Sequence, residues 1–297
     1  MPELPEVEVV RRGLLPYTDG ARAGRLTVHD PRSLRRSPGG PEALVAALEG
    51  RLLAAPMRRG KFLWIPFVED GEAAVVVHLG MSGQVRVDDA ARPDPPHLRL
   101  RLPVSAADGC EAELRFADQR IFGGWWLDRL VTDPATGERI PTTAAHIALD
   151  PLHPLFDADA VHDRWRRSRT RLKRALLDQS LVSGIGNIYA DEALWAARLH
   201  PERRTATLSR AQGRAVLAAA REVMERALAV GGTSFDALYV NVDGRSGYFA
   251  RSLNAYGRTG EQCERCRESG RGGVIVREAF MGRSSHRCSR CQPRPRT

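Results

Sequence analysis

The strongest constraint on the fold is a pair of C-x-x-C motifs near the end of this 297-residue chain. Cys263 and Cys266 form the first motif, Cys288 and Cys291 the second, and 21 residues separate the motifs. Each motif brings two thiolates to one edge of a metal ion, and two motifs complete the four-sulfur tetrahedron that zinc prefers. The spacing therefore predicts one structural zinc ion that holds a small hairpin. Cys110 stands apart and is interpreted as a buried or incidental thiol, not a fifth ligand.

Disulfide pairing of these cysteines is the alternative, and it depends on the compartment. The N-terminal stretch MPELPEVEVVRR carries three glutamates where an export signal needs basic and then apolar residues. No stretch approaches the roughly 18 consecutive apolar residues that span a bilayer. We therefore expect a cytoplasmic protein with no membrane partner, in a reducing compartment where zinc is favoured over disulfides.

The charge balance points to a polyanionic partner. The chain has 45 basic and 36 acidic residues, a net charge of +9, and residues 251–297 alone carry a net +7. This excess favours nucleic acid as the first partner to test, although many basic proteins bind none. Only two of the basic residues are lysines, Lys61 and Lys173. Genome composition or chance can explain this, but a retained lysine can also supply an amine that loses its proton, which arginine cannot.

Hydrophobic periodicity divides the chain into a strand-rich first part and a helical second part. An amphipathic helix begins near Leu4, and a second helix is expected over residues 41–50. Short alternating segments predict a β-sandwich, with strands near residues 25–29, 61–68, 73–79, 84–87, 98–102 and 112–116. Three helices are predicted later, over residues 160–179, 187–199 and 209–230.

The first residues could also supply a nucleophile. Removal of Met1 would leave Pro2 as a secondary amine, which attacks an aldehyde carbon to give an iminium, an electron sink. Glu3 and Glu6 could move protons at the same centre. In the alternative interpretation, these glutamates are only favourable charges in the first turn of a helix.

Several segments, in order along the chain, resemble bacterial formamidopyrimidine-DNA glycosylases in their actinobacterial form. They are MPELPEVEVVRRGL, RRGKFLW, HLGMSGQ, FADQRIFGGW, LVSGIGNIYADEALW, GGTSFDALYV, GYFARSLNAYGR and the two C-x-x-C motifs. The resemblance implies an α+β fold: an N-terminal helix on a β-sandwich, a helix-two-turn-helix domain and a zinc β-ribbon. It further implies a bifunctional base-excision repair enzyme, a DNA glycosylase with AP lyase activity that acts as a monomer on duplex DNA containing oxidised purines or abasic sites.

On this resemblance and the composition, we expect five segments. Residues 1–135 form the catalytic helix and sandwich, 136–154 a Pro- and Thr-rich linker, 155–250 the helix-two-turn-helix domain, 251–292 the ribbon and 293–297 a tail.

The resemblance also assigns the catalytic roles. Pro2 would attack C1′ of 8-oxoguanine or formamidopyrimidine nucleotides to form a Schiff base, and Glu3 would donate the proton that opens the sugar. Lys61 would act near the sugar-phosphate in β-elimination. Arg283 matches a ribbon-tip arginine that binds phosphate and is associated with δ-elimination.

The resemblance implies a further set of DNA-contacting residues. Met81, Arg120 and Phe122 would fill the space left by the extruded nucleotide. Arg120 and Phe122 are two apart and would share a side if the chain were extended there; for Met81 and Phe122, core packing is the alternative. The remaining contacts are Glu6, His97, Arg169, Lys173, Asn187 and Tyr248. Asn187 follows two glycines at a helix start, where it could hold a phosphate or be a plain N-cap.

The sequence departs from the resemblance at two points and is compatible with two other functional classes. Ser168 stands where some relatives have a phosphate-contacting lysine, and CRESGRGG lengthens the ribbon without changing the interval from Arg283 to Cys288. The related endonuclease VIII type removes oxidised pyrimidines and usually begins PEGPE, so Leu4 favours the purine enzyme. A non-catalytic zinc-ribbon DNA binder would explain the charge and the cysteines, but not Pro2, Glu3 and Lys61 together.

Overall fold

The computed structural model describes residues 2–69, 71–106, 109–232, 242 and 252–295. The chain divides into two compact units, and each is described by itself. The first contains the described residues up to 146 together with Gly231, Gly232 and Val242, and the second contains residues 147–230 and 252–295. No helix among the described residues is long and apolar enough to cross a membrane.

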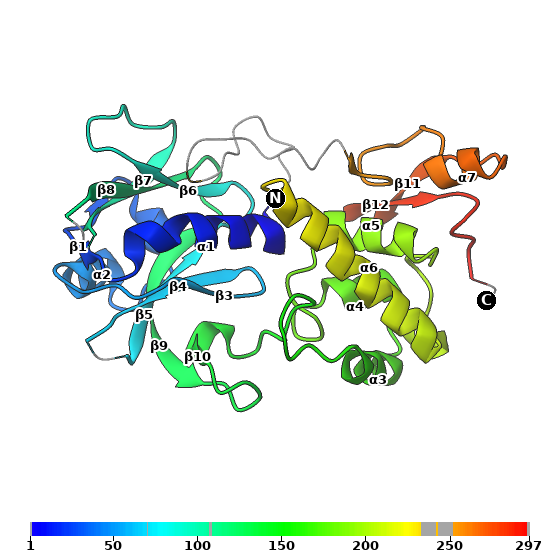
Figure 1. Ribbon diagram of the computed structural model, residues 1–297, viewed down its shortest axis with the longest axis horizontal. Coiled ribbons are helices and arrows are strands. Elements are labelled where there is room, and N and C mark those ends of the chain that lie inside the picture. The colour runs from blue at the N-terminus through cyan, green and yellow to red at the C-terminus, as the bar shows by residue number, and fades with distance from the viewer. Residues whose placement is uncertain (1, 70, 107–108, 233–241, 243–251, 296–297) are drawn as a thin grey trace. The chain divides into compact units, whose positions relative to one another are not determined.

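Two antiparallel five-stranded sheets form the first unit (Figure 1). One sheet contains β1 (Arg22–Ala23), β2 (Thr27–Val28), β6 (Gly83–Asp88), β7 (Leu98–Ser105) and β8 (Glu111–Asp118), in the order β1-β7-β8-β6 with β2 also paired to β7. The other has the order β10-β9-β5-β4-β3 and contains β3 (Met57–Arg59), β4 (Phe62–Pro66), β5 (Ala73–His78), β9 (Gly124–Thr132) and β10 (Arg139–Pro141).

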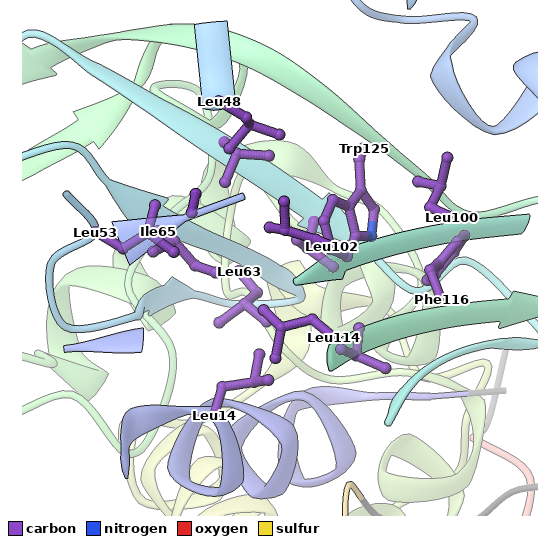
Figure 2. Packing of buried hydrophobic residues seen from close by; sticks show 14 of the residues in the cluster. Leu14, Leu48, Leu53, Leu63, Ile65, Leu100, Leu102, Leu114, Phe116 and Trp125 are labelled. Atoms are coloured by element: carbon purple, nitrogen blue, oxygen red, sulfur yellow. The ribbon is translucent and has the colours of Figure 1, made fainter. Parts of the chain in front are cut away.

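One apolar cluster joins the two sheets to α1 (Leu4–Thr18) and α2 (Gly40–Leu48). Figure 2 shows Leu63 of β4, Leu102 and Leu114 of the other sheet and Leu14 of α1 gathered in this cluster. The strands of the second sheet also bury their opposite face. Trp125 joins the main cluster, whereas Trp126 joins a smaller one with Trp64. The expected sandwich is thus present, with one sheet apolar on both faces.

Because both faces of the second sheet are buried, the sequence analysis missed one of its strands. β9 begins with Gly124 and two adjacent tryptophans, so its apolar residues do not alternate with polar ones. Apolar and polar residues alternate along a strand that has one solvent-exposed face. A strand that is buried on both faces lacks this alternation. β9 pairs with β10, which lies inside the segment expected to be a linker.

Among its described residues, the second unit contains five α-helices and a two-stranded ribbon. The elements are α3 (Ala158–Ser168), α4 (Leu172–Leu177), α5 (Asn187–Ala196), α6 (Arg210–Ala229), α7 (Glu264–Glu268), β11 (Ile275–Phe280) and β12 (Arg283–Cys288). The helix expected over residues 160–179 is in fact two helices. Arg169 ends α3 in the left-handed conformation, and Arg171 is extended and bridged to Arg204, so the helix cannot continue.

A buried carboxylate fastens α1 to β3. Glu8 accepts hydrogen bonds from Arg11 at 2.9 Å and Arg12 at 2.8 Å on its own helix, and from Arg58 of β3 at 3.0 Å. Burial alone would raise the pKa of the Glu8 carboxyl. The hydrogen bonds and positive charges of Arg11, Arg58 and Arg12 outweigh burial and lower this pKa to about 2.

We predict that Glu8→Gln lowers the free energy of unfolding at pH 7 by roughly 3 kcal/mol, because the lost charge is the one that three guanidiniums stabilise. The folded pKa lies below the unfolded value, so this stabilisation is complete above about pH 5 and fades as the pH falls toward 2. Urea unfolding at pH 7 and pH 3 measures the effect. The gap between wild type and Glu8→Gln should narrow at pH 3, and the exposed Glu42→Gln serves as control. A gap that does not change with pH would contradict the prediction.

Candidate functional site

Pro2 is buried and directly precedes the N-cap of α1. Glu3 and Glu6 form a capping box, in which the Glu6 carboxylate accepts the Glu3 amide at 2.8 Å. Both side chains are almost fully buried, and Gly232 lies so close that an added Cβ would be 3.3 Å from Glu6 Oε1. Glu6 therefore has a structural task at the helix start, and the capping box fixes the backbone on which Pro2 and Glu3 are carried.

Lys61 occupies the two-residue turn between β3 and β4, where Gly60 has a φ of 57°. Arg58 donates to the Gly60 carbonyl at 3.0 Å while its Nε is paired with Glu8 of α1. One guanidinium thus connects the Lys61 turn to the helix that begins two residues after Pro2. The turn that carries the half-buried Lys61 is thereby held by the same ionic cluster that fastens α1.

His78, at the end of β5, lies in the same region. Burial, together with the charges of Arg36 and Lys61, lowers the pKa of His78 to about 4, so the ring is neutral at pH 7. Its Nδ1 accepts the Gly80 amide at 3.1 Å, and its ring meets Phe62 edge-on at 5.1 Å. His78 therefore anchors the start of the loop that carries Met81.

Asp118, at the end of β8, is the centre of a second buried cluster. Its carboxylate accepts from the Ser82 hydroxyl at 2.5 Å, the Arg120 amide at 3.1 Å and the Gly123 amide at 2.8 Å. Its own amide donates to the His97 carbonyl at 3.0 Å. Asp118, which is 1% exposed, thus fastens three connections at one end of the sandwich, two through its carboxylate and one through its backbone amide.

The side chains carried by these connections point outward. Met81 is 39% exposed and Phe122 46% exposed, which argues against the core-packing alternative, and Arg120 and His97 are also exposed. The segment between Arg120 and Phe122 is not extended, because Ile121 has a φ of 54°.

The loop of Met81 and the loop of Phe122 are in contact. A Cβ on Gly80 would lie 2.5 Å from the Gly123 amide nitrogen and 2.6 Å from the Phe122 carbonyl carbon. The structure therefore brings Met81, Arg120, Phe122 and His97 to one end of the first unit.

We predict that Asp118→Asn loosens these loops without unfolding the sandwich. An amide nitrogen replaces one acceptor oxygen, so at least one buried donor loses its partner, at a cost of about 1–3 kcal/mol. Hydrogen exchange of the Gly123 and Arg120 amides should accelerate relative to wild type. The matched control is Asp89→Asn, whose carboxylate caps only its own turn. Unchanged exchange at both amides would contradict this role for Asp118.

The four ribbon cysteines converge in the second unit. Their sulfur atoms all lie within 4.8 Å of one another, with 3.7 Å between Cys266 and Cys288 and 3.9 Å between Cys263 and Cys291. These separations are far beyond the roughly 2.05 Å of a disulfide bond. Cys288 Sγ accepts the amides of residues 290 and 291 at 3.4 Å each, so backbone donors stabilise its thiolate. The cluster can hold a metal ion. Cys110 lies in the first unit and is exposed, so the expectation of a buried thiol is wrong, whereas its exclusion from the cluster agrees with the structure.

Two neighbours shape this cysteine cluster. The indole of Trp195, on α5, donates to Cys263 Sγ at 3.3 Å, and the Arg265 guanidinium stacks 4.0 Å from that indole. Gly273 is the last residue of the inserted ribbon turn and lies close to the sulfur atoms. A Cβ added to it would be 2.7 Å from Cys266 Sγ and 3.0 Å from Cys288 Sγ. The longer turn is therefore accommodated by a residue with no side chain.

We predict that Gly273→Ala weakens metal binding, since the added methyl group must displace two of the ligand sulfurs. Its neighbour Gly272, which has open space around its Cβ position, provides the control Gly272→Ala. Metal content and competition with a chelator measure the effect. Cys288→Ser should be depleted of metal, Gly273→Ala should lose it to the chelator more readily, and Gly272→Ala should match wild type. Equal retention by the two glycine variants would refute this argument.

The ribbon is docked onto α4 and α5 through its second strand. Lys173 and Asn187 both donate to the Ser284 carbonyl, each at 3.0 Å. Asp191 pairs with Lys173 at 2.6 Å and accepts from the Ser285 hydroxyl at 3.1 Å and the His286 amide at 2.8 Å. These contacts fix the residues directly after Arg283.

This docking changes how two predicted DNA contacts are understood. Lys173 is fully buried, so in this structure its ammonium supports the ribbon and is not at the surface. Asn187 is the first residue of α5, not its N-cap, and its side-chain amide faces the ribbon; its Oδ1 has no partner among the described residues.

Arg169 and Arg283 are exposed, and Arg283 follows a tight turn in which Met281 and Gly282 both have positive φ. Tyr248 lies outside the described residues.

Sequence reasoning missed the buried acids Asp118 and Asp191. Each had a signal. Asp118 ends a strand just before a glycine-containing turn, where a carboxylate can accept several amides. Asp191 lies in NIYADEALWA, a helix with apolar residues on both sides of its two acids, which indicates buried carboxylates that need partners.

Comparison with known proteins places this arrangement in a family. Residues 1–125 match the formamidopyrimidine-DNA glycosylase N-terminal domain, and residues 147–238 match the formamidopyrimidine-DNA glycosylase H2TH domain. The chain is 55% identical over 300 residues to the formamidopyrimidine-DNA glycosylase of Thermobifida fusca, covering 100% of this chain and 99% of that protein. It is 53% identical over 304 residues to that of Mycobacterium ulcerans, with both chains fully covered.

Solved structures show the same fold. A Lactococcus lactis Fpg mutant in complex with DNA containing Fapy-dG has a TM-score of 0.83 and 31% identity, covering 99% of this chain and all of that one. The Lactococcus lactis Fpg in complex with DNA containing an abasic site has a TM-score of 0.81 and 31% identity, covering 98% of this chain and all of that one.

A β-sandwich with a capped N-terminal helix, an H2TH domain and a four-cysteine ribbon define a DNA-binding repair enzyme. The chain belongs to the formamidopyrimidine-DNA glycosylase family. Members of this family are DNA glycosylases with AP lyase activity that act in base excision repair. The fold class, the family and the enzyme class expected from the sequence are thereby confirmed.

Proposed function

We propose that this protein excises oxidised purines, namely 8-oxoguanine and formamidopyrimidines, from duplex DNA through a Schiff base on Pro2, and then cleaves the strand by β,δ-elimination. The observation that carries the proposal is the end of the sandwich organised by Asp118. There, two exposed apolar side chains, Met81 and Phe122, and the exposed Arg120 are carried on loops fixed by one buried carboxylate. A purely structural surface gains nothing from exposing such a pair, whereas a protein that extrudes a nucleotide needs an apolar wedge and a hydrogen-bonding cation.

The chemistry then follows from what each residue can do. With Met1 removed, the Pro2 nitrogen forms a bond to C1′, and the damaged base leaves with its bonding electron pair and a proton. Glu3 protonates O4′ as the C1′–O4′ bond breaks, which leaves an iminium on Pro2. Loss of a proton from C2′ expels the 3′ phosphate, and a second elimination expels the 5′ phosphate. Lys61 acts at the sugar-phosphate, and Arg283 binds phosphate with its planar fork.

Zinc is the metal that we propose for the cysteine cluster. Sulfurs about 2.3 Å from a central zinc ion form a tetrahedron with edges of about 3.8 Å. The 3.7 Å and 3.9 Å separations match this edge length, and the other sulfur pairs lie within 4.8 Å. With four protein ligands the ion has no open position, so its contribution is to hold Cys263, Cys266, Cys288 and Cys291 together, and with them the strand that carries Arg283.

The DNA contacts proposed for the second unit follow from the docked ribbon. Arg283 and Arg169 are exposed and can meet phosphates directly. Asn187 stands at the start of α5, where backbone amides are available to an anion. Lys173 contributes by holding the Ser284 carbonyl, which fixes the position of Arg283.

We predict that borohydride links the protein covalently to an 8-oxoguanine strand paired with cytosine, because an iminium is reducible, whereas an enzyme that uses water leaves no such bond. Pro2→Gly should slow trapping strongly, and residues added before Pro2 should abolish it by turning the amine into an amide. Gel mobility of the denatured complex measures the yield. Lys61→Arg keeps the charge but should lower the single-turnover rate, since a guanidinium cannot give up its proton.

A thymine-glycol duplex measured in parallel separates this proposal from an endonuclease VIII type of activity, which would trap the pyrimidine lesion preferentially. Normal strand cleavage by an N-terminally extended protein would refute the role of Pro2. A Lys61→Arg variant with the wild-type rate would remove Lys61 from the mechanism.

A further inference from the structure

A basic cavity in the second unit has no part in the chemistry proposed at Pro2. It has a volume of about 1140 Å³ and lies among the α3–α4 connection, the segment around residues 200–207, the ribbon tip and the C-terminal tail. Its charged and titratable lining consists of Arg169, Arg171, Arg174, Arg204, Arg294 and His200, with Glu202 as the acid. The lining thus has a clear positive excess.

His200 supplies the observation that points to a ligand. The residue is 4% exposed and lines the cavity, and its Nδ1 accepts the Glu202 amide at 3.1 Å. The ring proton must therefore be on Nε2 when the ring is neutral. Burial, followed by the charge of Arg287, keeps the pKa of His200 below its usual value, so the neutral form dominates near pH 7. Nε2 has no hydrogen-bond partner among the described residues, which leaves a buried donor that needs an acceptor.

The arginines divide into paired and unpaired groups. Arg171 is paired with Glu202, and Arg294 with Glu278 at 3.1 Å. For Arg169, Arg174 and Arg204, the described part of the chain offers no carboxylate within ion-pair distance. Guanidiniums gathered without acids, beside a buried N–H that lacks an acceptor, are complementary to an oxyanion with several acceptor oxygens.

We propose that this cavity is a second phosphate-binding subsite, in which the Nε2–H of His200 and the guanidiniums of Arg169, Arg174 and Arg204 hold a phosphodiester of the DNA strand. The subsite extends the phosphate contact proposed above for Arg169 and is separate from those proposed for Asn187 and Arg283. Two features favour a strand over a free phosphate ion. The volume exceeds what one phosphate fills, and Phe280 and Met281, which line the cavity, lie just before Arg283 on the ribbon tip. The proposal adds to the function proposed above and requires nothing of Pro2.

The first test uses the full-length, metal-loaded protein and inorganic phosphate as probe. Imidazole ¹⁵N spectra should show a saturable shift of the His200 Nε2–H signal, assigned by its loss in His200→Gln. Arg174→Ala/Arg204→Ala should weaken this binding at least tenfold. Both arginines are exposed, so this variant is expected to fold even if His200→Gln does not. Arg221→Ala, an exposed arginine of α6 outside the cavity, should leave the phosphate affinity unchanged.

The second test identifies the source of the phosphate. Affinity for an undamaged duplex is measured against salt concentration, where each lost phosphate contact lowers the log-log slope by about 0.9. A lower slope in Arg174→Ala/Arg204→Ala, but not in Arg221→Ala, supports a strand phosphodiester. Weaker phosphate binding with an unchanged slope overturns the strand as occupant in favour of a free phosphate. No shift of His200 and no change in slope overturns the subsite altogether.

Borohydride trapping at saturating DNA separates this proposal from the mechanism at Pro2. It should be slowed strongly by Pro2→Gly, a variant that should keep the wild-type phosphate affinity and salt slope because Pro2 does not line the cavity. A failure of the subsite and a failure of the Schiff-base mechanism therefore give different results.

Discussion

In the second unit, the attachment of the ribbon to the helices depends on two consecutive carboxylates of α5. Glu192 accepts the backbone amides of residues 254, 255 and 256 at 2.7–2.9 Å, and Asp191 accepts from Ser285 and His286 of β12. Both are almost fully buried, so each would be costly without these partners. Figure 1 shows α5 beside β12, the strand that these contacts hold. The ribbon is thus attached to the helices by charge-assisted hydrogen bonds at two separate stretches of chain, in addition to its cysteine cluster.

In the first unit, too, buried carboxylates join separate elements by accepting several hydrogen bonds. Glu8 connects α1 to β3, and Asp118 connects three loops that carry exposed side chains. Near Asp118, His97 and Ile121 both have positive φ, a conformation that costs energy in residues other than glycine. The hydrogen bonds to Asp118 hold the backbone in these conformations. Rigid loops carrying exposed wedge residues are suited to filling a gap in a base stack, since flexible ones would lose entropy on every encounter with DNA.

The sequence allowed the broad architecture to be predicted, because each broad feature has a local signature. Cysteine spacing predicted the cluster, and alternation predicted most strands of the sandwich. β9 was missed because both its faces are buried, and the helix expected over residues 160–179 is broken by a left-handed Arg169 that no propensity signals. Lys173 could be singled out as unusual, but its burial against Asp191 depends on a partner 18 residues away. The tasks of Asp118 and His200 likewise arise only from contacts across the fold.

The scarcity of lysine has a practical consequence for handling this protein. Lys173 is sealed inside the second unit, so amine-directed reagents have only Lys61 and the chain terminus as targets. Both belong to the region where the nucleophile is proposed, so random acylation or coupling to an amine-reactive support would modify that region first. The exposed thiol of Cys110 lies on the first unit, apart from the ribbon cysteines. It offers a single position for attaching a fluorophore or a surface tether while leaving both amines untouched.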